Sequence, residues 1–62
     1  MMKREVIVHT QSGRSFRGVL WRRYGPWIVL RQASLITGND TADLEGDVWV
    51  DRRNLDFMQV VR

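Results

Sequence analysis

The chain has 62 residues, and ten lysine and arginine residues against seven aspartate and glutamate residues give it a formal charge of +3. It contains no cysteine and a single histidine, which excludes disulfide bonds, thiolate metal sites and a histidine metal cluster. A chain of this length forms one small domain, residues 1–62, and no apolar run reaches the roughly 20 residues that span a bilayer, so we expect a cytoplasmic protein without a membrane partner.

The first half of the chain alternates with the period of a β-strand. Residues 5 to 11, EVIVHTQ, predict a first strand, Ser12-Gly13 predicts a turn, and residues 14 to 23 predict a second strand. Gly18 lies in the inward row of the second strand, where it permits the sharp bend or close backbone approach that a small barrel needs. The other inward residues are Phe16 and Leu20, and the outward residues are Arg17, Val19 and Trp21.

The middle of the chain contains a break, a third strand and a polar segment. Tyr24-Gly25-Pro26 interrupts the alternation, because proline removes a ladder donor and restricts the residue before it. Residues 27 to 36 then predict a third strand with a buried centre at 28 to 30. Residues 37 to 45, TGNDTADLE, predict a mobile hairpin loop.

The last part of the chain predicts two more strands. Residues 47 to 51, DVWVD, give a fourth strand, with Val48 and Val50 on one side and Trp49 on the other. Arg52-Arg53-Asn54 predicts a tight turn, of which a helical turn with three residues per turn is one form. Residues 55 to 61 predict a fifth strand, with Leu55 and Phe57 on one face and Asp56 and Met58 on the other.

Short strands joined by tight turns, without a helical period, are typical of an all-β fold. We therefore expect a five-stranded, strongly bent small barrel of the SH3-like barrel class. Glycine and aliphatic patterning specify such a barrel better than they specify an activity.

Two motifs within this order of elements resemble the Sm-like family, including its bacterial host-factor branch. The motifs are Gly13-Arg-Ser-Phe16-Arg-Gly18-Val-Leu20 and Gly46-Asp-Val48-Trp-Val50-Asp-Arg-Arg-Asn54-Leu55, and the match runs from about Glu5 to Val61. The resemblance implies the bent five-stranded barrel, usually preceded by a short N-terminal helix, for which Met1 to Arg4 are too short. It also implies a homo-oligomeric ring of about five to eight subunits, in which the fourth strand of one subunit pairs with the fifth strand of the next, and which binds single-stranded, often uridine-rich, RNA.

The family reads RNA with residues from two loops, and this chain differs from the family there. Tyr24 and about Ile28 stand where the family has an aspartate and an asparagine, and Asp51-Arg52 stands where it has an Arg-Gly pair. The host-factor branch has a Lys-His pair after its fourth strand, and Arg52-Arg53 stands at that place. The resemblance thus implies a basic site without the family's uridine-binding residues.

Arginines from two turns form the candidate RNA site. Nine of the ten basic residues are arginine, and in a ring Arg22-Arg23 and Arg52-Arg53 would surround the pore as a basic annulus that attracts phosphate. The alternative is that they form ordinary solvated or interfacial ion pairs with nearby aspartates. Tyr24 and Trp27 either stack on bases or pack on the protein, Tyr24 as a lid over the barrel end. The predicted nucleic-acid-binding residues are Arg22, Arg23, Tyr24, Trp27, Arg52, Arg53 and Asn54.

Outward apolar side chains predict a surface for self-association. Trp21 and Trp49 lie on outward strand positions, where they serve either as subunit contacts or as stacking platforms. His9, without a sequence partner for chemistry, is expected at the surface or in an interface. The predicted oligomer interface is Trp21, Trp49, Phe57 and Met58.

The sequence lacks the residue patterns of catalysis. It has no Ser-His-Asp arrangement, no phosphate-binding glycine-rich loop and no metal-ligand spacing, so we expect no enzyme, cofactor or metal. Two hypotheses remain, a ring that binds single-stranded RNA and an assembly module without a nucleic-acid role. GVLW, W-x-VLRQASL and VDRRN-x-DF-x-Q also faintly resemble short reading frames of phages that infect actinobacteria, which hints at a phage origin and names no function.

Overall fold

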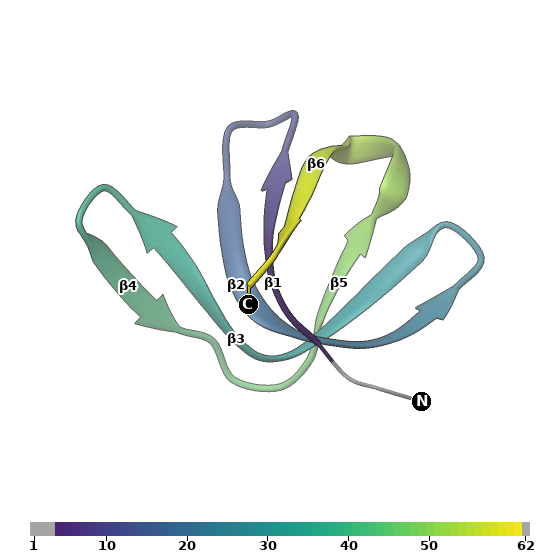
Figure 1. Cartoon of the computed structure of the whole chain (residues 1–62), viewed down its shortest axis with the longest axis horizontal. Helices are drawn as coiled ribbons and strands as arrows, with labels where there is room; N and C mark the ends of the chain where they lie inside the picture. Colours follow the sequence, from purple (N-terminus) through teal and green to yellow (C-terminus); the bar gives the residue numbers. More distant parts are fainter. Residues whose placement is uncertain (1–3, 62) are drawn as a thin grey trace.

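The structure is a computed structural model that describes residues 4–61, and these residues form six β-strands and one short 3₁₀-helix (Figure 1). Within this range no helix is long and apolar enough to cross a membrane. The prediction of an all-β, strongly bent barrel is confirmed, and so is the helical turn after the penultimate strand. The elements are β1 (Arg4–Thr10), β2 (Ser15–Tyr24), β3 (Trp27–Thr37), β4 (Asp40–Asp43), β5 (Val48–Asp51), η1 (Arg52–Asn54) and β6 (Leu55–Val60).

All strand pairs are antiparallel, and the sheet runs in the order β4-β3-β2-β1-β6, with β5 also on β3. The first part of β3 pairs with β5 and its last part pairs with β4, so two different strands share the same edge of β3. Between residues 4 and 61, β5 pairs only with β3 and β6 pairs only with β1. Figure 1 shows β5 and β6 diverging from each other, so the barrel is open between these two strands.

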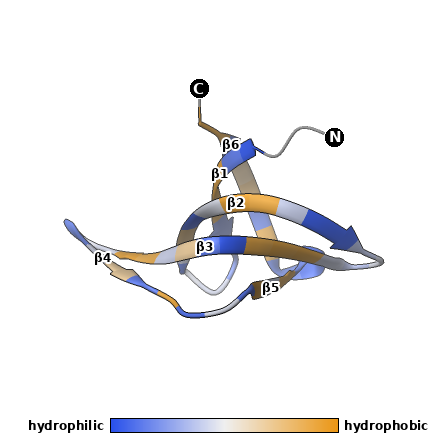
Figure 2. Ribbon diagram, turned by 90° about the horizontal axis from the view of Figure 1, so that it is seen from below, coloured by the Kyte–Doolittle hydropathy of each residue, from blue (hydrophilic) through white to orange (hydrophobic). Residues whose placement is uncertain are grey.

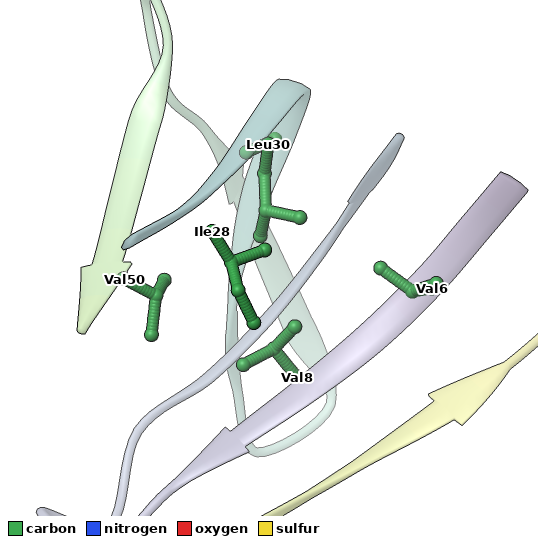
Figure 3. Close-up of a cluster of buried hydrophobic side chains, with 6 residues drawn as sticks. Val6, Val8, Ile28, Leu30 and Val50 are labelled. Atoms are coloured by element: carbon green, nitrogen blue, oxygen red, sulfur yellow. The ribbon is translucent and has the colours of Figure 1, made fainter. Parts of the chain in front are cut away.

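An aliphatic core fills the concave side of the sheet (Figure 3). Half-buried side chains from β2, β5 and β6 close around it, and they are Phe16, Leu20, Val48, Leu55 and Met58. Burying aliphatic side chains of this kind contributes about 1.5–3 kcal/mol each to folding. The core consists of Val6 and Val8 from β1, Ile28, Leu30 and Ala33 from β3, and Val50 from β5.

Gly18 lies where β2 bends against β3. A Cβ atom on Gly18 would lie 3.1 Å from the carbonyl oxygen of Arg31 and 3.2 Å from the Cα of Ala33. The pairing of β2 with β3 shifts register at the same place, between Arg17 and Val19. The close backbone approach predicted at Gly18 is therefore confirmed, and it belongs to the bend of the barrel.

Gln32 stands opposite this bend with a φ of 52°, in the left-handed region that glycine favours. This conformation costs a non-glycine residue about 1–2 kcal/mol. Glycine would avoid that cost, but its greater conformational freedom in the unfolded state would offset part of the gain. We expect Gln32→Gly to raise the free energy of unfolding by about 0.5–1 kcal/mol, measured by urea denaturation. Gln11→Gly, at an exposed glutamine without positive φ, is the control and should be destabilising. Equal destabilisation by the two substitutions would contradict the strain at Gln32.

The segment predicted as a mobile loop instead contains the short strand β4. β3 extends to Thr37, the chain turns at Gly38-Asn39, and β4 pairs back with Thr37 opposite Asp40. Gly38 has a φ of 58°, which suits a tight two-residue hairpin turn. All four residues of β4 are exposed, so no alternation of buried and exposed side chains marks this strand in the sequence.

The predicted faces of the last strand were wrong, because a β-bulge interrupts its alternation. Thr10 pairs with Leu55 and His9 pairs with Phe57, which leaves Asp56 without a partner in the ladder. Consequently Leu55 and Met58 pack against the core, whereas Phe57 is on the outer face and 51% exposed. The expected lack of an N-terminal helix concerns Met1 to Arg4; residues 1–3 lie outside the described residues, and Arg4 already belongs to β1.

Candidate nucleic-acid interface

The β2–β3 turn and η1 lie side by side at one end of the molecule. The Arg52 amide donates a hydrogen bond of 2.6 Å to the carbonyl of Pro26, and its guanidinium lies 3.5 Å from the carbonyl oxygen of Gly25. The antiparallel pair Trp27 and Asp51 fixes the two elements in this register. Figure 2 shows that β2 becomes hydrophilic at its C-terminal end, where Arg22 and Arg23 lead into the turn. The structure thus brings both arginine pairs to the same end.

The side chain of Asp51 begins η1 and binds Arg53. Its carboxylate accepts a bond of 2.9 Å from the Arg53 amide and bonds of 3.1 and 2.7 Å from the Arg53 guanidinium. These hydrogen bonds, first from the side chain and then from the backbone of Arg53, hold the pKa of Asp51 below its ordinary value. The Arg53 side chain is nevertheless 79% exposed, so it can still face an anionic ligand. Asp51 offsets one of the arginine charges, and the surface remains basic.

An aromatic cluster, defined as Tyr24, Trp27 and Trp49, lies beside these arginines. The ring of Tyr24 stacks almost parallel to that of Trp49, with centroids 5.5 Å apart, and Trp27 tilts toward Trp49 at 6.3 Å. Arg22 donates a hydrogen bond of 2.6 Å to the Tyr24 hydroxyl. Tyr24 therefore packs on Trp49 of β5 and is 46% exposed. Local patterning does not group Trp49 with Tyr24, because their proximity follows from the pairing of β3 with β5.

Arg23 and Asn54 differ in their surroundings. Arg23 is exposed. The side-chain amide of Asn54 lies 3.4 Å from the Ser12 hydroxyl, and the backbone carbonyl of Asn54 accepts a bond of 2.7 Å from the Gln11 amide. Asn54 thus ties η1 to the β1–β2 turn, and it lines a hollow of about 290 Å³ together with Thr10 and Trp27. Asn54 therefore has a structural role, and its predicted part in nucleic-acid binding stays a prediction.

The four residues predicted for self-association lie in different surroundings. The Arg31 guanidinium covers the Trp21 ring at 3.9 Å, and Trp49 belongs to the aromatic cluster. Phe57, on the edge strand β6, stacks on His9 with ring centroids 4.2 Å apart. Met58 packs against the core, because the bulge turns it inward. Within one protomer these residues do not form a single patch.

The His9 imidazole is held on both ring nitrogens. Nδ1 lies 3.0 Å from the Ser15 hydroxyl and Nε2 lies 2.8 Å from the side-chain oxygen of Gln59. These contacts link β1 to its neighbours β2 and β6 on the outer face. Across residues 4–61, no group of three or more histidine, cysteine, aspartate or glutamate side chains is arranged to hold a metal ion.

The architecture is similar to that of a solved structure described as a heptameric archaeal Sm protein with implications for the eukaryotic snRNP core. The superposition has a TM-score of 0.83 and covers 95% of this chain and 87% of that one, at 22% sequence identity. The chain has an Sm-like fold. No family model and no curated protein matches the chain, so the Sm-like fold rests on the backbone and not on overall sequence similarity.

Proposed function

We propose that the chain assembles into a homo-oligomeric ring that binds single-stranded RNA at a basic annulus. The observation that carries this proposal is the juxtaposition of the β2–β3 turn with η1, held by the bond from the Arg52 amide to Pro26. It gathers two pairs of exposed arginines at one end of an Sm-like fold. Clustered arginines at a surface attract phosphate and release counterions on binding.

The open barrel supports assembly into a ring. β5 and β6 each have an edge without a strand partner in the described part of the chain, and exposed strand edges readily pair with another chain. β5 and β6 correspond to the fourth and fifth strands of the sequence prediction. Pairing β5 of one protomer with β6 of the next would close a cyclic array of about five to eight subunits. The similar archaeal Sm protein is heptameric, and its fold is shared over 95% of this chain.

The side chains at the turn favour RNA binding with weak sequence preference. Tyr24 and Trp27 are 46% and 38% exposed, and a base stacked on an aromatic ring contributes about 1–3 kcal/mol whatever its identity. Tyr24 and Asp51 replace residues of the family's uridine pocket, and Asp51 is engaged with Arg53. We therefore propose recognition of the backbone and of unpaired bases, rather than strong selection for uridine.

The test is a titration of the purified protein with uridine-rich and adenine-rich oligonucleotides at low and high salt, with native mass spectrometry in parallel. Both oligonucleotides should bind at low salt, affinity should fall steeply as salt rises, and the mass should correspond to a closed oligomer. Absence of binding to either oligonucleotide at low salt would refute the RNA part of the proposal. A stable monomer at micromolar concentration would refute the ring.

The alternative function is an assembly module without a nucleic-acid role. Two observations favour it: Arg53 is already paired with Asp51, and the aromatic rings stack on one another. An intact oligomer that neither co-purifies with nucleic acid nor binds the oligonucleotides would select this alternative. In both cases we propose a cytoplasmic protein without catalytic activity. The phage origin remains a prediction from sequence.

A further inference from the structure

A second hollow, of about 310 Å³, lies on the outer face of the sheet, away from the core. Val29 lines it, and because Val29 alternates with the core residues Ile28 and Leu30 it must face the opposite side of β3. Val29 is nevertheless buried, with 3% exposure. The aromatic side chains Trp21, Tyr24 and Trp49 line the hollow around it. The outer face therefore carries a recess in which Val29 and three aromatic side chains lie beside charged ones.

The rim of this hollow is polar and carries both signs of charge. The Arg31 Nε atom lies 3.4 Å from Oδ1 of Asp47, and the two side chains are 46% and 41% exposed. Arg22 also lines the hollow, bonded to the Tyr24 hydroxyl. A guanidinium has five N–H donors and a carboxylate about four acceptor positions, so these contacts leave capacity for a ligand. At Arg31 and Asp47 the rim presents donors directly beside acceptors.

The chemistry of the hollow selects a planar ligand that carries negative charge. Arg31 already covers the Trp21 ring and Tyr24 stacks on Trp49, so a flat ring would stack on the exposed parts of Tyr24 and Trp49, which are 46% and 52% exposed. Two arginines disfavour a cationic ligand while attracting phosphate. A nucleotide combines these two properties. Its base edge would meet Arg31 and Asp47, and its phosphate would lie toward Arg22.

An arginine beside a carboxylate can discriminate among bases through its donors and acceptors. The pairing edge of guanine has two adjacent N–H donors for a carboxylate and a carbonyl oxygen for a guanidinium, whereas adenine and uracil can each offer the carboxylate only a single donor group there. We propose that this hollow is a guanine nucleotide site, with Asp47 as the residue that determines specificity. The proposal goes beyond the RNA-binding annulus and does not depend on ring formation, because every lining residue comes from one protomer.

The test uses the tryptophans that line the hollow. Their fluorescence, excited at the red edge of the indole band where nucleotides absorb little, is followed during titrations with GMP, AMP, UMP and CMP. GMP should saturate the signal at a concentration about ten-fold lower than AMP. Asp47→Asn should reduce this preference to about two-fold or less, because an amide keeps only one acceptor. Asp40→Asn, at an exposed carboxylate of β4 outside the hollow, is the matched control and should keep the preference.

Two further sets of titrations distinguish a free nucleotide from a guanosine within RNA as the ligand. Uridine oligonucleotides with one central guanosine are compared with those with one central adenosine, for the native sequence and for Asp47→Asn. A preference seen only with the oligonucleotides assigns the site to guanosine within RNA, and a preference also seen with GMP assigns it to the nucleotide itself. The Arg52→Ala, Arg53→Ala double variant should retain GMP binding, which keeps this test separate from the annulus. Equal binding of guanine and adenine in both arms, or a preference that survives Asp47→Asn, overturns the proposal.

Discussion

Replacing Arg52 and Arg53 together with alanine is expected to weaken RNA binding at least about 100-fold at low salt and to reduce its salt dependence. The effect is large because each protomer of a ring would lose two charges from the same annulus. The fold should survive, since the Arg53 amide still caps η1 through Asp51 and exposed ion pairs contribute little to stability. Fluorescence anisotropy with a labelled uridine oligonucleotide at several salt concentrations measures both quantities.

The matched control for this variant removes two arginines from elsewhere on the surface. Arg4 and Arg17 are exposed residues of β1 and β2. Arg17 forms an exposed ion pair with Glu5, in which its Nε atom lies 2.7 Å from the carboxylate. Their replacement by alanine makes the same change in net charge, and RNA affinity should fall by less than about ten-fold. Equal losses in the two variants would show that net charge, and not the annulus, attracts RNA. Native mass spectrometry should give the same oligomer for both.

Leu30→Ala is expected to lower the free energy of unfolding by about 3 kcal/mol. Leu30 is among the largest fully buried side chains, with 0% exposure, and it contributes to the centre of the core. A protein of this size has a total stability of only about 5–15 kcal/mol, so the variant should lose much of its margin. Urea denaturation followed by far-ultraviolet circular dichroism measures the change.

Leu35→Ala is the control for the core substitution, because it makes the same chemical change on the same strand. Leu35 is half-buried and lies beyond the bend of β3, opposite Phe16 and Ala42. Its replacement should cost about 1 kcal/mol or less. A loss at Leu35 as large as that at Leu30 would contradict the place of Leu30, and not Leu35, in the buried core.

The alternation of β1 and β2 predicted which side chains of these strands face the core, because their inward positions pack there. Gly18, placed in the inward row of β2, is buried, and so are Val6 and Val8, which alternate along β1. The prediction failed at β6, where the bulge at Asp56 depends on how β6 pairs with His9 and Thr10, residues far away in the chain. It also missed β4, whose exposed side chains carry no periodic pattern.

The candidate site was predicted only in part from the sequence. The sequence predicted that Arg22-Arg23 and Arg52-Arg53 contribute to one annulus, and the bond from the Arg52 amide to Pro26 brings the two segments together. The aromatic cluster and the hollow above Val29 depend on β3 passing between β2 and β5, a tertiary arrangement that local patterning does not encode. The sequence indicated Asp47 only as one of the aspartates near the arginines, because its place beside Arg31 follows from the pairing of Leu30 with Val48.

The purely aliphatic core has a practical consequence for spectroscopy. Trp21, Trp27 and Trp49 all lie outside that core, at half-buried or exposed positions around the β2–β3 turn and β5. Indole emission from this protein should therefore report events on the outer surface, such as ligand or subunit contact, more sensitively than it reports loss of the packed interior. The native tryptophans thus allow binding to be followed without an added dye, and unfolding is better followed by far-ultraviolet circular dichroism of the backbone.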